Sequence, residues 1–417
     1  MRLKTAIDGM EGMYEPSYFF IKIETTQKLD INIDTHSQTF IHEYIHFIQD
    51  IFLPYCIRNN VNEVHRFVYI TEKTKSENIQ RPFNDWSPEF LCIERQHQQT
   101  WGYSKPVKKA APITDYDVNH YTIAETGARV FKYTALLSNG CRYPIGAKDM
   151  LEYIAHKIES KHWPTDQPDL PYRTMDLVFD QLGLGTIPDM CKIALIEFCL
   201  HNDNPIHHLF RTIETIQNGS LGLKGVEQCY LHFDFLDYVL KRLLWGARGG
   251  FEETIHSKLK RRLETIQSHI QKKYPAEQFK DISGWFDDVI SYVDKNLKGR
   301  MYFAELYEKE KNDFLIEIDN LLKALGVPLV FNSLNEHISL LPEKYNKDSF
   351  IQFYTSFKFN EFLTHSDQTC PMCEFCENST PELMSPDCID NVARKVSEDN
   401  QCPFGQFLDN HKINIVR

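Results

Sequence analysis

The residues best suited to chemistry in this sequence lie in the stretch FIHEYIHFIQD at positions 40–50. It contains the pattern His-Glu-x-x-His at His42, Glu43 and His46. On a helix, residues four apart lie on the same face, so the two imidazoles would point toward one metal ion. Glu43 would reach a water molecule beside that ion without being a ligand itself. The pattern predicts a zinc ion that activates water for attack on an amide bond.

A helix must position these side chains, and the surrounding sequence predicts one. Thr35 is the expected N-cap, Gln38 follows it as in a capping box, and Pro54 marks the expected end. Polar groups are costly to bury without partners, which favours metal binding over a coincidental match on a surface helix. The apolar positions at helical spacing are Phe40, Ile41, Tyr44, Ile45, Ile48, Ile51 and Phe52.

A catalytic zinc ion needs a third protein ligand from elsewhere in the chain. We expect Glu125, which lies in a predicted helix over residues 119–137 and is flanked by small residues that would allow close approach to the motif helix. Zinc would neutralise a glutamate that is otherwise expensive to bury. A solvent-facing role for Glu125 is the plain alternative, and the competing ligands are Glu94, His97 and His120.

His42, Glu43 and His46, followed downstream by Glu125, resemble the gluzincin type of zinc metallopeptidase over about residues 35–135. The resemblance implies that the two histidines and the distant glutamate bind zinc, and that Glu43 is the general base. A third histidine soon after the motif, as in the metzincin pattern, is absent because Asp50 and Ile51 follow instead.

Two further roles near the zinc follow from this mechanism. A hydrogen-bond donor would stabilise the oxyanion; we select Tyr172, with Arg142, Tyr143 and His201 as alternatives. Gln49 or Asp50 would orient a ligand imidazole, unless these side chains face solvent.

A second metal site is predicted near the C-terminus, where five of the 11 cysteines fall within residues 370–402. Four thiolates form a closed structural zinc site, and we assign Cys370, Cys373, Cys388 and Cys402 to it, with Cys376 spare. An iron–sulfur cluster and the absence of any metal are the alternatives. The scattered cysteines in the rest of the chain are expected to be small core residues.

The composition is that of a globular protein of 417 residues, with 42% hydrophobic and 25% charged residues. A net charge of -12 argues against general nucleic-acid binding, because a phosphate backbone would be repelled. The N-terminus lacks the apolar run of a signal peptide, and no stretch is apolar enough for a membrane span. We therefore expect a cytoplasmic protein without membrane association.

The predicted fold class is α+β and predominantly helical, in three regions. A zincin-like metallopeptidase domain with a short N-terminal sheet is expected over residues 1–248, a helical region over 249–325, and a C-terminal region with the cysteine cluster over 326–417. The boundary after the first region rests on the glycine-rich break at 246–250.

Strands are expected at residues 17–24, 29–34, 327–331 and 350–359, where aromatic and β-branched residues gather or alternate with polar ones. Residues 76–115 carry several prolines and are expected to be irregular, as a lid, as a wall of the substrate cleft, or as a solvated insertion.

The function predicted is that of a zinc metallopeptidase that hydrolyses an intracellular protein or peptide substrate. The C-terminal half would serve substrate recognition or a regulatory protein partner. A non-catalytic zinc-binding interaction protein is one alternative, but a purely structural site has no use for a base such as Glu43. A zinc hydrolase that acts on a non-peptide bond is the other.

Overall fold

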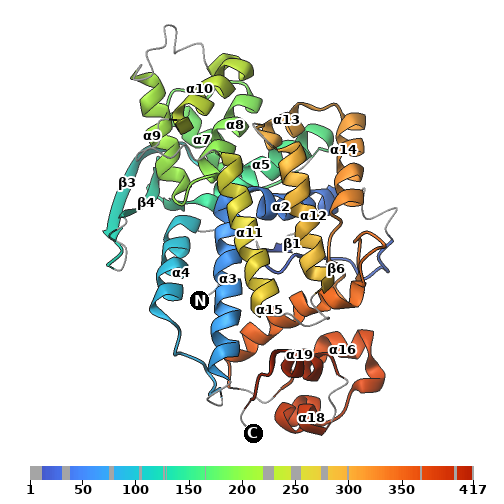
Figure 1. Ribbon diagram of the computed structural model, residues 1–417. Coiled ribbons are helices and arrows are strands. Elements are labelled where there is room, and N and C mark those ends of the chain that lie inside the picture. The colour runs from blue at the N-terminus through green and yellow to red at the C-terminus, as the bar shows by residue number, and fades with distance from the viewer. Residues whose placement is uncertain are drawn as a thin grey trace.

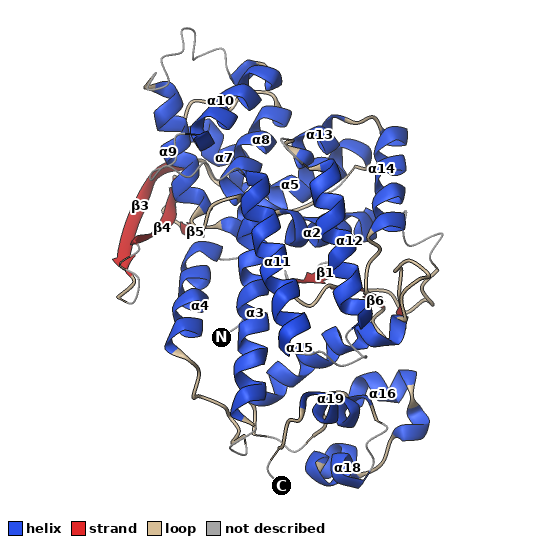
Figure 2. Cartoon of the chain, in the orientation of Figure 1, coloured by secondary structure: helices blue, strands red, loops and turns tan. Residues whose placement is uncertain are grey.

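The computed structural model describes residues 12–30, 38–74, 79–102, 106–124, 127, 129–164, 166–218, 230–245, 255–273, 280–297, 300–366, 369–398 and 402–415. Helices form most of this part of the chain, and two small sheets accompany them (Figure 2). The predicted α+β, predominantly helical class is confirmed. None of the described helices is long and apolar enough to cross a bilayer.

The first sheet combines two strands near the N-terminus with two strands from residues 329–338. Its strand order is β1-β2-β6-β7, with β1 antiparallel to β2, β2 parallel to β6 and β6 antiparallel to β7. The predicted strands at 17–24 and 327–331 contain β2 and β6, whereas the one expected at 29–34 lies mostly outside the described residues. The strands are β1 (Gly12–Glu15), β2 (Phe20–Ile23), β6 (Leu329–Phe331) and β7 (His337–Ile338).

The motif helix is α2 (Gln38–Phe52), as predicted, and it lies at the centre of the molecule (Figure 1). Its apolar side chains are almost fully buried in the largest hydrophobic cluster. It packs against β1 and β2, against α3 (Pro54–Lys73), and against α5 (Ala147–His162). The expected N-cap, Thr35, lies outside the described residues.

The remaining helices surround this centre. Helix α11 packs along α3, and α13 packs against α8. Both the division into three regions and the glycine-rich boundary at 246–250, which lies outside the described residues, stay predictions. In chain order these helices are α4 (Pro88–Trp101), α6 (Asp169–Tyr172), α7 (Thr174–Gln181), α8 (Asp189–Leu200), α9 (Pro205–Gln217), α10 (Phe233–Trp245), α11 (Ile255–Lys273), α12 (Lys280–Asn296), α13 (Tyr302–Glu308) and α14 (Lys311–Ala324).

The prediction of a helix over residues 119–137 is wrong. This region belongs to a second, antiparallel sheet formed by β3 (Ile113–Thr122), β4 (Arg129–Leu137) and β5 (Arg142–Ile145). The small residues that suggested close helix packing lie at the β3–β4 connection. There Gly127 has φ +66°, in the left-handed region that favours glycine.

Two other expectations about secondary structure are wrong. The aromatic run at 350–359 is not a strand but part of α15 (Ile351–Thr364). This helix lies between two hydrophobic clusters, so Phe353 packs toward one and Tyr354 toward the other. Burial on both sides hides the helical period from the sequence. The stretch 76–115 is also not wholly irregular, because it contains α4.

The C-terminal residues form a small lobe of short helices below α15 (Figure 1). They share the second hydrophobic cluster with β2, β6 and α15. The elements after β7 are η3 (Lys347–Phe350), α15, α16 (Cys373–Ser379), η4 (Pro381–Leu383), α17 (Asp387–Asp390), α18 (Val392–Glu398) and α19 (Pro403–His411).

Candidate metal centre

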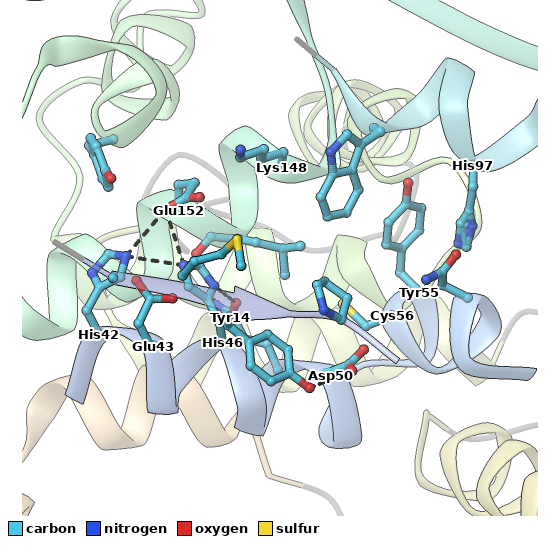
Figure 3. Close-up of a pocket in the computed structure, with 18 residues that line it drawn as sticks. Tyr14, His42, Glu43, His46, Asp50, Tyr55, Cys56, His97, Lys148 and Glu152 are labelled. Atoms are coloured by element: carbon cyan, nitrogen blue, oxygen red, sulfur yellow. Dashed lines mark hydrogen bonds and ion pairs between the residues drawn. The ribbon is translucent and has the colours of Figure 1, made fainter. Parts of the chain in front are cut away.

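Helices α2 and α5 bring three potential metal ligands to one point (Figure 3). His42 and His46 lie one turn apart on α2, and Glu152 faces them from α5. The two Nε2 atoms are 3.2 Å apart, and Glu152 Oε2 lies 3.2 Å from His46 Nε2 and 3.4 Å from His42 Nε2. Within the described ranges, this is the one group of three such residues whose ligand atoms lie close enough to share an ion.

The spacing of these atoms fits a tetrahedral ion. Two ligand atoms about 2.1 Å from one zinc at a tetrahedral angle lie about 3.4 Å apart. All three separations are within a few tenths of an ångström of that value. Two imidazoles and one carboxylate are also a donor set typical of catalytic zinc. These residues could therefore hold a metal ion without rearrangement.

The outer nitrogen of each histidine ring is held by a buried oxygen. His42 Nδ1 is 2.9 Å from Glu159 Oε2, and His46 Nδ1 is 2.8 Å from Gln49 Oε1. Gln49 is itself oriented, because its amide donates to the Leu151 carbonyl at 3.0 Å. A proton on each Nδ1 leaves both Nε2 lone pairs facing each other and Glu152. That arrangement is unfavourable by itself and suits a shared cation.

The electrostatics of the group also favour a positive charge at this point. Burial lowers the pKa of His42, but the hydrogen bonds with Glu152 and Glu159 outweigh burial and raise the pKa well above its usual value. Burial likewise raises the pKa of Glu152, but His46 and His42 lower it more strongly, so this carboxylate stays ionised. The field that attracts a proton to the His42 ring equally attracts a metal cation.

Glu43 lies beside the two histidine rings and faces the same space (Figure 3). Only 5% of it is exposed, and burial raises its pKa, although His42 and His46 lower it. The backbone N–H of Tyr14 on β1 donates to this carboxylate. A carboxyl group with a raised pKa, next to a metal site but outside the ligand set, is suited to accept and return a proton.

Close packing of β1 on α2 fixes Glu43. A Cβ atom added at Gly12 would lie 2.9 Å from both Cγ and Oε1 of Glu43 and 2.7 Å from Cγ2 of Thr39. A side chain at this point of the strand would therefore have to displace the Glu43 or Thr39 side chain.

A pocket of about 700 Å³, including its opening, extends from these residues across the molecule. At one end are the metal group and Glu43, and at the other are Tyr55 and His97 (Figure 3). Tyr172 also lines the pocket, with its ring near that of His42. Strand β1 forms one wall, through residues Gly12 to Tyr14.

Glu152 was missed as a ligand by sequence reasoning, and Glu125, chosen instead, lies outside the described residues. The assignment of Glu125 stays a prediction, although its helix does not exist. A signal for Glu152 was present: it stands seven residues before Glu159 in an apolar segment, so both acids share one face of helix α5. The competing ligand His97 lies at the far end of the pocket, whereas Glu94 and His120 do not line it.

The structure places the residues predicted as oxyanion donor and as orienting group, and it separates them from their alternatives. Tyr172 lines the pocket with its ring 5.9 Å from that of His42, and its role as oxyanion donor stays a prediction. The alternatives Arg142, Tyr143 and His201 do not line it. Of the two candidates to orient a ligand, Gln49 does so, whereas Asp50 accepts hydrogen bonds from Tyr14 and Ser17 at 2.8 Å.

The predicted cysteine ligands Cys370, Cys373, Cys388 and Cys402 lie together in the C-terminal lobe, and none forms a disulfide. Cys376, expected to be spare, is buried among them.

Comparison of the chain with known protein families, with curated proteins and with solved structures finds no match. Any assignment of function therefore rests on the geometry of these sites.

Proposed function

We propose that this protein is a zinc-dependent hydrolase, and specifically a metallopeptidase. The observation that carries the proposal is the position of Glu43, a buried non-ligand carboxylate beside His42, His46 and Glu152 at one end of a pocket. A purely structural metal site needs neither a neighbouring base nor an open approach.

Zinc would be held by the three ligand residues, and when bound it would polarise a substrate carbonyl and lower the pKa of water at the site. Glu43 takes a proton from the attacking water and passes it to the departing amine. The hydroxyl of Tyr172 donates a hydrogen bond to the oxygen on which negative charge develops. Glu159 and Gln49 keep both imidazoles in the orientation that ligation needs.

The third ligand in this proposal is Glu152, in the role for which the sequence suggested Glu125. With Glu152 on a helix downstream of the motif, the chain keeps the gluzincin-like order of two histidines, a base and a distant glutamate. The zincin-like character of the region around α2 and α5 is part of the proposal.

Strand β1 supports a peptide rather than another substrate. It is the outermost strand of its sheet in the described part of the chain, and it borders the pocket beside Glu43. An extended peptide could lie along the outer side of β1 and present a peptide bond to the metal group. A substrate without a peptide backbone would make no use of this strand.

The test is cleavage of a proteome-derived peptide library, followed by mass spectrometry. We expect the zinc-loaded wild type to cleave peptides and Glu43→Gln to lose this activity while it keeps its zinc. Glu89→Gln, at an exposed position on α4, is the matched control and should behave as wild type. Zinc binding without cleavage by any of the three proteins would refute the peptidase proposal and favour the interaction protein.

A further inference from the structure

The C-terminal lobe contains a second concentration of metal-binding side chains, far from α2 in the sequence. We propose that Cys370, Cys376, Cys388 and Cys402 hold a thiolate-bound metal centre that stabilises this lobe. The proposal is independent of the hydrolase activity, since none of these residues lines the pocket at the motif helix.

Four thiols converge in the core of the lobe from different elements. Cys376 comes from α16, Cys388 from α17, Cys402 from the N-terminus of α19, and Cys370 from the turn before α16. Each is only 5 to 6% exposed, and all four belong to the same hydrophobic cluster. Cys373 is only partly buried at the rim of this cluster, so burial replaces Cys373 by Cys376 in the ligand set predicted from sequence.

The four thiols share one buried, apolar part of the lobe. Four thiolates in such a space would repel one another, and a bound cation removes that repulsion. The grouping is therefore unfavourable for free thiolates and favourable for a metal.

Two Cys-Pro turns prepare their sulfurs for negative charge. The backbone N–H of Met372 donates to the sulfur of Cys370, and that of Gly405 donates to Cys402 Sγ at 3.2 Å. Hydrogen bonds to a sulfur favour its thiolate form, which is the form that binds metals. A backbone bond of 2.7 Å from Cys370 N–H to the Cys388 carbonyl ties two of the elements together.

The helices of the lobe are short. Its helices have between four and nine residues, too short to be stable alone. Small units of this kind commonly depend on a metal or disulfides. A metal centre would fix the lobe against α15, where Phe404 and Phe407 of α19 pack on Phe359.

Two kinds of centre share this ligand chemistry. One tetrahedral zinc would hold its sulfurs about 3.8 Å apart, whereas no three cysteine sulfurs in the described chain lie within 4.8 Å of one another. Zinc would draw the side chains inward. An iron–sulfur cluster, which four cysteines also hold, is the other centre.

The experiment measures zinc, iron and acid-labile sulfide in the full-length protein purified without oxygen. We expect a metal centre in addition to the ion at the motif helix, either one zinc or iron with sulfide. Cys370→Ser and Cys402→Ser should each lose this centre and keep the motif-helix ion, whereas Cys373→Ser and Cys141→Ser, at an exposed position, should keep both.

A second measurement uses the wild type alone, so it does not depend on whether the cysteine variants fold. Cobalt-substituted or iron-loaded wild type should show the sulfur-to-metal charge-transfer absorption of thiolate ligands. Wild type with no metal beyond the motif-helix ion, and no such absorption, would overturn the proposal. Loss of the centre in Cys373→Ser, to the same extent as in Cys370→Ser, would overturn the ligand set.

Discussion

The hydrogen bond between Glu159 and His42 makes a quantitative prediction about metal affinity. Glu159 Oε2 lies 2.9 Å from His42 Nδ1, and its other oxygen accepts from the Gln38 amide at 2.6 Å. The carboxylate is buried and its pKa is held below the usual value: burial raises it, but the hydrogen bond with His42 outweighs burial. It is therefore charged, and it orients the ring that would bind the metal.

Removal of such an orienting carboxylate typically costs about 10–100-fold in metal affinity, or about 1.4–2.7 kcal/mol. Glu159→Gln keeps an oxygen that can accept from Nδ1 and loses only the charge, so we expect about tenfold weaker binding. Glu159→Ala also releases the ring and allows the proton to move to Nε2, which blocks ligation. For this variant we expect metal binding to be about 100-fold weaker.

Cobalt(II) binding in competition with a chelator measures this affinity, because cobalt bound to imidazole and carboxylate is distinguishable from thiolate-bound cobalt by its absorption. Thermal unfolding of the metal-free proteins controls for loss of the fold, and Glu89→Ala is the matched surface variant. A folded Glu159→Ala that binds cobalt as tightly as wild type would refute the role assigned to Glu159.

Three other predictions concern the base, the oxyanion donor and pH. Gly12→Ala should lower kcat by up to about 100-fold with zinc retained, because the new methyl group displaces Glu43; unchanged peptide cleavage would contradict this. Tyr172→Phe should lower kcat by about 10²–10³-fold with little change in zinc content, and a variant as active as wild type would exclude the hydroxyl as donor. Burial raises the pKa of Glu197 from 4.5 to about 8, although N–H groups such as that of Phe303 lower it. The folded protein therefore binds this proton more tightly than the unfolded chain, and Tm should fall as pH rises across that interval. Glu197→Gln should show a smaller fall in Tm, and an identical fall in both proteins would contradict the assignment.

The sequence was sufficient for the part of the site that depends on local geometry. His42, Glu43 and His46 lie on one predicted helix, and spacing alone places two imidazoles one turn apart. Gln49 is also local, since it lies three residues after His46 on the same helix. Each of these inferences needed only the helical period.

The third ligand depended on packing between segments that are distant in sequence. Glu152 meets His46 only because α5 packs on α2, and the two residues are 106 positions apart. The choice of Glu125 relied on small neighbouring residues as a sign of close helix packing, but that segment is a β-hairpin. Local composition did not distinguish the connection between two strands from a helix–helix contact.

Tertiary burial likewise overrode local preference in α15 and in the C-terminal lobe. The aromatic run in α15 has high strand propensity, yet it forms a helix because both sides of that helix face apolar clusters. Spacing could predict that cysteines gather near the C-terminus, but it could not show that Cys376 is buried and that Cys373 lies at the rim.

The most direct test of the central claim is anomalous X-ray diffraction from zinc-loaded crystals at the zinc absorption edge. The proposed centre predicts one peak at the end of the pocket, about 2.0–2.2 Å from His42 Nε2, His46 Nε2 and a carboxylate oxygen of Glu152. The absence of a peak at this point, or an ion bound by the two histidines with Glu125 in place of Glu152, would contradict it.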